Sequence, residues 1–124
     1  MKKVLIVDDD PAFVGLIQKA IGITGRYEVS SSGEPRAALD SLTKNIPDVI
    51  LLDVRMPEMN GIEFLRELRG SDTGKNIPVI MTTNDSSLDT MSQSAELNVR
   101  AYVLKANESL KAIVETIDRV FAQA

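Results

Sequence analysis

Two groups of acidic residues could do chemistry in this chain of 124 residues. The run Asp8–Asp10 directly follows the apolar segment Val4–Val7, and Asp53 directly follows the apolar segment Val49–Leu52. Carboxylates brought close together repel one another, and the pKa of one of them rises unless a cation lies among them. Mg²⁺ suits such a cluster because it prefers oxygen ligands and keeps waters and phosphate oxygens in its shell. The acids therefore indicate a magnesium site, while Asp10 could equally cap a helix and the others could be solvated loop residues.

The composition restricts the remaining chemistry. The chain contains no cysteine and no histidine, which excludes disulfides, thiolate nucleophiles, a histidine general base and metal sites built on either residue. Its 18 acidic residues outnumber its 14 basic residues, and the net charge of -4 argues against direct nucleic-acid binding. Carboxylates, lysines and hydroxyls remain, and these groups suit hard cations and phosphoryl groups.

Two further apolar segments end in polar residues. Lys105 follows Ala101–Leu104, and Thr82 and Thr83 close the segment that begins at Val79. Beside a metal-loaded acidic cluster, Lys105 could bind an incoming phosphoryl oxygen and a threonine hydroxyl could donate a hydrogen bond. The plain alternatives are a solvated lysine and a hydroxyl that caps a nearby backbone group.

Apolar segments alternate with helical patterns along the whole chain. Continuous apolar runs are typical of strands buried on both faces of a parallel sheet, whereas Tyr27–Ser30 alternates in polarity and suits an edge strand. Asp10 and Gly25 suit the start and the end of the first helix, and Asn107 suits the start of the last. The helix predicted over Ser87–Leu97 has only a thin apolar stripe, which makes it a candidate for mobility.

Five strand–helix pairs predict an α/β fold, with a doubly wound parallel sheet of five strands and helices on both faces. The flavodoxin-like strand order 2-1-3-4-5 fits best because it places the alternating second strand at an edge. In such sheets ligands bind at the carboxyl ends of the first and third strands, where Asp8, Asp9 and Asp53 would meet.

Residues 1–124 are expected to form one domain, without a second, output domain. The apolar run near Met1 is too short for an export signal or a membrane span, so we expect a cytoplasmic protein.

With these residues identified, the whole chain resembles the receiver domains of two-component response regulators, of the chemotaxis CheY type. The most specific stretch is Asp53–Gly61, which is similar to the phosphoacceptor loop of that family. The stretch Lys2–Asp9 resembles the first strand and its acidic end. Ile77–Met81 leads to the threonine, and Tyr102–Lys105 leads to the lysine.

The resemblance implies a regulatory phosphoacceptor of a phosphorelay, not an enzyme, although it assists its own phosphorylation and dephosphorylation. It implies that Asp53 accepts a phosphoryl group from a phosphohistidine and that Lys105 pairs with this group. It also implies that Asp9, Asp53 and the main-chain carbonyl of Arg55 ligate Mg²⁺ or Mn²⁺, with Asp8 acting largely through water. Such chemistry is mostly positioning and charge neutralisation, and the donor histidine belongs to the partner.

A conformational switch is also implied. The family's spacing selects Thr83 over Thr82 as the residue that the phosphoryl group draws inward, which leaves space for Tyr102 to turn in. The surface built by the fourth and fifth strands and the helices after them would change as a result. The implied partners are a histidine kinase or histidine phosphotransfer protein and a downstream target or lost output domain. A phosphorylation-dependent dimer is a further option, and neither nucleic acid nor membrane is expected.

Three positions depart from the family's pattern. Ala106 follows Lys105 where the family usually has a proline, often after a cis bond, and Asn84 stands where a small residue is usual. Arg55 and Asp85 occupy variable positions at the mouth of the site, and we expect them to form an ion pair that restricts attacking water.

Two alternative functions use the same acidic cluster or the same topology. A Mg²⁺-dependent phosphatase or hydrolase of the Asp-x-Asp type would place a second aspartate two residues after Asp53, where this chain has Arg55. A flavin- or nucleotide-binding module would need a glycine-rich phosphate loop after a strand, and the sequence has none.

Overall fold

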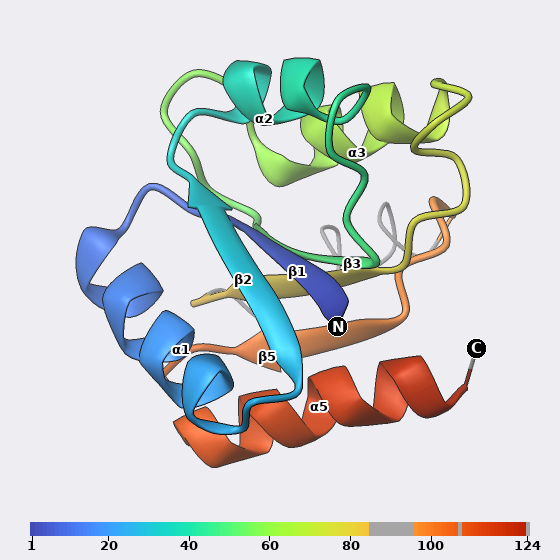
Figure 1. Cartoon of the computed structure of the whole chain (residues 1–124). Helices are drawn as coiled ribbons and strands as arrows, with labels where there is room; N and C mark the ends of the chain where they lie inside the picture. Colours follow the sequence, from blue (N-terminus) through green and yellow to red (C-terminus); the bar gives the residue numbers. More distant parts are fainter. Residues whose placement is uncertain (85–95, 107, 124) are drawn as a thin grey trace.

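The computed structural model describes residues 1–84, 96–106 and 108–123. Figure 1 shows its elements, which are β1 (Lys2–Val7), α1 (Pro11–Ile23), β2 (Tyr27–Ser32), α2 (Pro35–Ser41), β3 (Val49–Asp53), α3 (Gly61–Arg69), β4 (Val79–Thr83), β5 (Ala101–Leu104) and α5 (Leu110–Ala122). Most of the helix predicted over Ser87–Leu97 lies outside the described residues. Its last two predicted residues, Glu96 and Leu97, belong to a turn.

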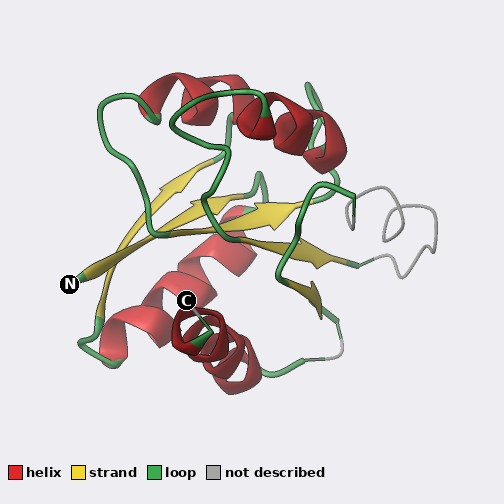
Figure 2. Ribbon diagram, turned by 90° about the vertical axis from the view of Figure 1, so that its right-hand side faces the viewer, coloured by secondary structure: helices red, strands yellow, loops and turns green. Residues whose placement is uncertain are grey.

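The five described strands form one sheet in the order β2-β1-β3-β4-β5, and every neighbouring pair is parallel. The doubly wound order predicted from the sequence is confirmed, with β2 at one edge and β5 at the other. Helices cover both faces of the sheet, α2 and α3 on one side and α1 and α5 on the other (Figure 2). Because the strands are parallel, their carboxyl ends all lie at the same edge of the sheet.

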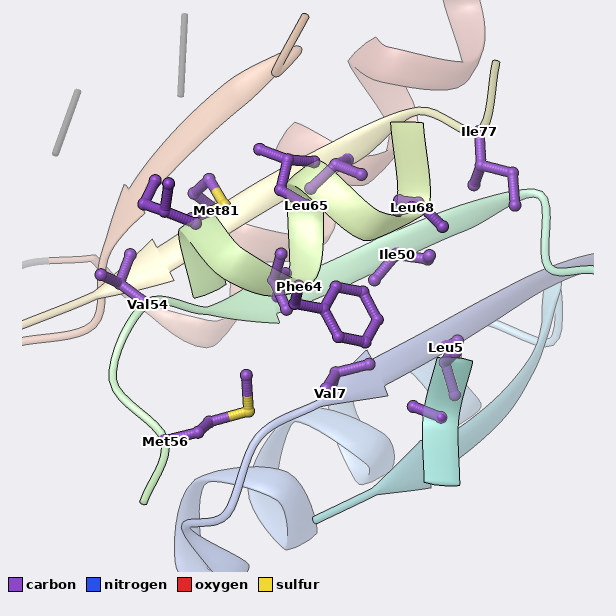
Figure 3. Close-up of a cluster of buried hydrophobic side chains, with 14 of the residues drawn as sticks. Leu5, Val7, Ile50, Val54, Met56, Phe64, Leu65, Leu68, Ile77 and Met81 are labelled. Atoms are coloured by element: carbon purple, nitrogen blue, oxygen red, sulfur yellow. The ribbon is translucent and has the colours of Figure 1, made fainter. Parts of the chain in front are cut away.

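Two apolar clusters fix the sheet between its helical layers. Side chains alternate along a strand, so each central strand contributes to both clusters. On the α3 side, Phe64 and Leu65 belong to the same buried cluster as Val7 and Ile50 (Figure 3). The second cluster joins the other sheet face to α1 and α5, with its members Val4, Ile6, Ile17, Ile21, Val49, Leu51, Ile80, Val103, Ile113, Val114, Ile117 and Val120. Full burial of one such side chain contributes about 1.5–3 kcal/mol to the stability of the fold. The two clusters therefore hold the strands, and with them the strand ends, in fixed positions.

Local signals set the helix ends. Asp10 caps α1 as predicted, since its carboxylate accepts the N–H of Ala12 at 3.1 Å. Gly25 follows α1 with a φ of 69°, a conformation that glycine adopts without strain. The cap predicted for the last helix is wrong, because α5 begins at Leu110 and Ser109 accepts the N–H of Ala112. The predicted cap, Asn107, lies outside the described residues.

None of the helices in the described ranges combines the length and the apolar character that crossing a membrane requires.

Candidate functional site

Three carboxylates meet at the carboxyl ends of β1 and β3. These strands are neighbours, and Val7 pairs with Leu52 immediately before the acidic residues. One carboxylate oxygen from each of Asp8, Asp9 and Asp53 lies within 4.8 Å of the others. Asp8 and Asp53 are buried, whereas Asp9 is exposed. The predicted convergence of the two acidic segments is confirmed.

The backbone around Asp8 is tied to its surroundings on both sides. The N–H of Asp8 donates to the carbonyl of Ser32 at 3.1 Å, which continues the pairing of β1 with β2. The Asp8 carboxylate accepts the N–H of Asp10 at 2.9 Å. Because Asp10 caps α1, the start of this helix is held in a defined position relative to the acidic cluster.

The loop after Asp53 returns closely to the end of its own strand. Gly61 donates its N–H to the carbonyl of Val54 at 2.7 Å. A Cβ atom at Gly61 would lie 2.6 Å from the Asp53 carbonyl oxygen and 2.9 Å from Val54 Cα, so only glycine fits without a shift. The Asp53 carboxylate in turn accepts the N–H of Arg55 at 3.4 Å. The close return of the loop therefore fixes the backbone that carries Asp53.

Lys105 extends from the end of β5 into the same cluster. Its Nζ lies 2.5 Å from Asp8 Oδ2 and 3.5 Å from Asp53 Oδ1, and its side chain is only 8% exposed. The same nitrogen lies 4.5 Å from the centroid of the Phe13 ring. The peptide bond between Lys105 and Ala106 is trans, and the N–H of Lys105 donates to the carbonyl of Thr83 at 2.9 Å. Lys105 thus reaches the acids with alanine at the position where the family usually has proline.

The electrostatic balance of the cluster is visible at Asp53. The pKa of its carboxyl group is raised from 3.8 to about 6, mainly by burial and next by the negative charge of Asp8. Lys105 and the N–H of Arg55 act in the opposite direction. One ammonium group faces three carboxylates, so the cluster favours additional positive charge. An all-oxygen donor set of this kind fits a hard divalent cation.

The two threonines at the end of β4 lie on opposite faces of the sheet. Asp53 pairs with Thr82, and Met81 pairs with Tyr102. Because side chains alternate along a strand, Thr82 shares the face of Asp53, while Thr83 shares the face of Met81 and Tyr102. Both threonines are buried, and Tyr102 is half-buried against the apolar cluster on the α3 side.

Two polar residues follow the strands that end at the site. Arg55 and Asn84 are exposed, and they follow the ends of β3 and β4. Asp85, the expected partner of Arg55, lies outside the described residues. The contact between Phe13 and Lys105 was not predicted from the sequence. The sequence feature that points to this contact is an aromatic residue, Phe13, in the first turn after the acidic run.

Comparisons with known proteins agree on one family. The family model described as "Response regulator receiver domain" matches residues 4–118. Sporulation initiation phosphotransferase F of Bacillus subtilis is 36% identical over 104 residues, which cover 84% of this chain and 82% of that protein. Other curated relatives are longer, and the chain spans only 33%, 22% and 43% of three of them.

Solved structures agree with the fold. Chemotaxis protein CheY4 of Vibrio cholerae superposes with a TM-score of 0.88 at 29% identity, covering 97% of this chain and 98% of that one. The Mn²⁺-bound form of response regulator Rcp1 gives a TM-score of 0.82 at 27% identity, covering 97% and 91% of the two chains.

Proposed function

The chain belongs to the response regulator receiver domain family, and we propose that Asp53 is the residue on which it accepts a phosphoryl group. Receiver domains are regulatory phosphoacceptor modules of two-component systems, so the function implied by the sequence resemblance is confirmed at this level. The alternative of a Mg²⁺-dependent phosphatase gains no support from these relatives. We further propose that residues 1–124 act as one receiver domain.

The convergence of Asp8, Asp9, Asp53 and Lys105 supports the proposal. An oxygen of the Asp53 carboxylate attacks the phosphorus of a phosphohistidine. The phosphorus–nitrogen bond breaks, and its electron pair leaves with the imidazole, which takes up a proton. Lys105 lies close enough to contact an oxygen of the arriving group, where its positive charge offsets the added negative charge.

We propose that Asp8, Asp9, Asp53 and the main-chain carbonyl of Arg55 hold Mg²⁺ or Mn²⁺, with Asp8 acting largely through water. The donor set and the raised pKa of Asp53 fit this assignment, and one structural relative is a Mn²⁺-bound form. The ion would neutralise charge on the phosphoryl oxygens. The ion pair with Asp8 holds the Lys105 ammonium beside Asp53.

We propose that Thr83 and Tyr102 form the switch, because alternation along β4 places Thr83 on the face that carries Tyr102. Thr82 provides a matched comparison, since it is the neighbour of Asp53 in the strand register. Thr83→Val should abolish the phosphorylation-dependent change in Tyr102 fluorescence, whereas Thr82→Val should preserve it. The opposite pattern would transfer the switch role to Thr82.

The proposed donor is a histidine kinase or a histidine phosphotransfer protein, because the chain itself contains no histidine. Receiver domains are phosphorylated by histidine kinases and pass signals to downstream targets. For this chain, we propose a target protein or an output domain as the recipient of the signal, and a phosphorylation-dependent dimer as a further option. We also propose that the site assists hydrolysis of its own phosphoryl group.

Intact-mass measurement after incubation with a small phosphodonor and Mg²⁺ tests the assignment. The wild type should gain one phosphoryl group, and chelation of the metal should prevent the gain. Asp53→Asn should remain unmodified, whereas Asp40→Asn, which alters an exposed carboxylate on α2, should behave as the wild type does. Phosphorylation of Asp53→Asn at the wild-type rate would refute the proposal.

A further inference from the structure

Phe13 lies in the first turn of α1, next to the proposed phosphoacceptor site. Two hydrogen bonds connect this turn to the acidic cluster. The Asp10 carboxylate accepts the N–H of Phe13 at 3.4 Å, and the N–H of Asp10 donates to Asp8 at 2.9 Å. The position of the ring is therefore fixed by the same short segment that positions Asp8.

The face of this ring contacts the ammonium group of Lys105. Nζ lies 4.5 Å from the ring centroid, inside the distance of about 6 Å at which a cation is attracted to an aromatic face. The attraction strengthens when the cation is removed from water, and the Lys105 side chain is only 8% exposed. Among the described residues, the carboxylates of Asp8 and Asp53 and the ring of Phe13 surround the ammonium.

A flexible lysine needs such neighbours in order to act at one place. Four methylene groups separate the ammonium from the backbone, and holding them in one geometry costs conformational entropy. The two carboxylates attract the ammonium from the side of the acidic cluster. The ring adds a surface that limits the approach of Nζ and excludes water from part of the ammonium.

We propose that Phe13 is a positioning residue for phosphoryl transfer, and that its ring face holds the Lys105 ammonium beside Asp53. This inference rests on the proposed role of Lys105 at the phosphoacceptor site. The ring does not touch the reacting atoms, and it acts through Lys105 alone. An aliphatic side chain could fill the same space against the neighbouring apolar cluster, but it has no negative aromatic face.

Nuclear magnetic resonance of the metal-free protein tests the contact without reference to function. The ε-methylene protons of Lys105 should show an upfield ring-current shift in the wild type and in Phe13→Tyr. The shift should be lost in Phe13→Leu and Phe13→Met. Phe121→Leu is the matched control, because it removes a second partly buried ring that lies 6.0 Å from Lys2 Nζ and stacks on Tyr27. It should leave the Lys105 signal unchanged.

The rate of phosphorylation by a small phosphodonor tests the consequence. Phe13→Leu and Phe13→Met should react about threefold to tenfold more slowly than the wild type, and Phe13→Tyr should restore most of the rate. Equal rates for wild type and both aliphatic variants, or an unchanged Lys105 signal in them, would overturn the inference. Failure of the wild type to be phosphorylated would instead refute the proposed function, and the ring-current result would still decide whether the contact exists.

Discussion

The carboxyl group of Asp53 is subject to two opposing influences. Removal from water and the charge of Asp8 favour its protonated form, while Lys105 and the N–H of Arg55 favour the carboxylate. The first pair is stronger, since the pKa rises from 3.8 to about 6. A group whose pKa is higher in the folded than in the unfolded state stabilises the fold at low pH, and this contribution is lost as the pH rises.

Asp53→Asn should therefore stabilise the metal-free protein near neutral pH. The difference should be fully developed above about pH 7, at about 1–3 kcal/mol, and should shrink as the pH falls through 6 towards 3.8. Urea unfolding in the presence of a chelator across this range measures it. Asp40→Asn serves as the control for loss of an exposed carboxylate. A stability gain that grows as the pH falls would have the wrong sign for this explanation.

The residues with proposed chemical roles were predictable where a strand end and a charge coincide. Asp8, Asp9, Asp53 and Lys105 each follow an apolar run, and parallel strands deliver their carboxyl ends to one edge. The contact of Phe13 with Lys105 was not predictable in this way. It depends on the direction in which α1 leaves β1, and periodicity carries no information about that direction.

At the scale of elements, Arg69 joins the end of α3 to two segments that lie on either side of β4 in the sequence. Its Nη1 donates to the carbonyls of Gly74 at 3.0 Å and Ile77 at 2.7 Å. Its Nε donates to Leu97 at 2.8 Å, and its Nη2 donates to Asn98 at 3.2 Å. Burial lowers the pKa of the Arg69 guanidinium, with a smaller contribution from Arg100. The hydrogen bonds compensate for this burial and hold the chain that enters β5 against α3.

Arg69→Met should lower the free energy of unfolding by about 2–3 kcal/mol, because it leaves several partly buried carbonyls without their donor. Arg66→Met is the matched control on the last turn of the same helix, and its side chain is exposed. A surface change of this kind should alter stability by less than about 0.5 kcal/mol. Equal losses in the two variants, measured by urea unfolding, would contradict the assigned role of Arg69.

Element types were predicted better than element ends. The central strands were predictable because continuous apolar runs are typical of strands buried on both faces, as β1 and β3 are. The start of α5 was placed too early, since Asn107 and Ser109 are both suitable capping residues. Capping preference alone does not choose between two candidates two residues apart.

At the scale of the whole molecule, the site depends on the order of the strands. The acids come from β1 and β3, and the lysine comes from β5, two strands beyond β3 in the sheet. This order was predicted because it is a common order of doubly wound sheets with five strands, and the edge character of Tyr27–Ser30 supported it by placing β2 outside β1. Any ion bound by these acids connects segments that are far apart in sequence, so its binding should stabilise the fold as a unit.

Mg²⁺ should raise the unfolding free energy by about 2.7 kcal/mol when its concentration is about 100 times its dissociation constant. Asp9→Asn should reduce this gain while changing the metal-free stability little, since Asp9 is the exposed member of the cluster. NaCl at matched ionic strength controls for general screening of the acidic chain. A gain of the same size in Asp9→Asn, Asp53→Asn and the wild type would show that Mg²⁺ acts elsewhere.

Direct localisation of the phosphoryl group is the sharpest test of the central claim. Borohydride reduces an aspartyl phosphate and leaves unmodified carboxylates unchanged, so peptide mass spectrometry after reduction reads the position of the modification. Protein treated with a small phosphodonor and Mg²⁺ should carry the reduced residue at position 53 alone. Reduction at Asp8 or Asp9, or no reduction in a sample whose intact mass shows the added group, would contradict the assignment of Asp53.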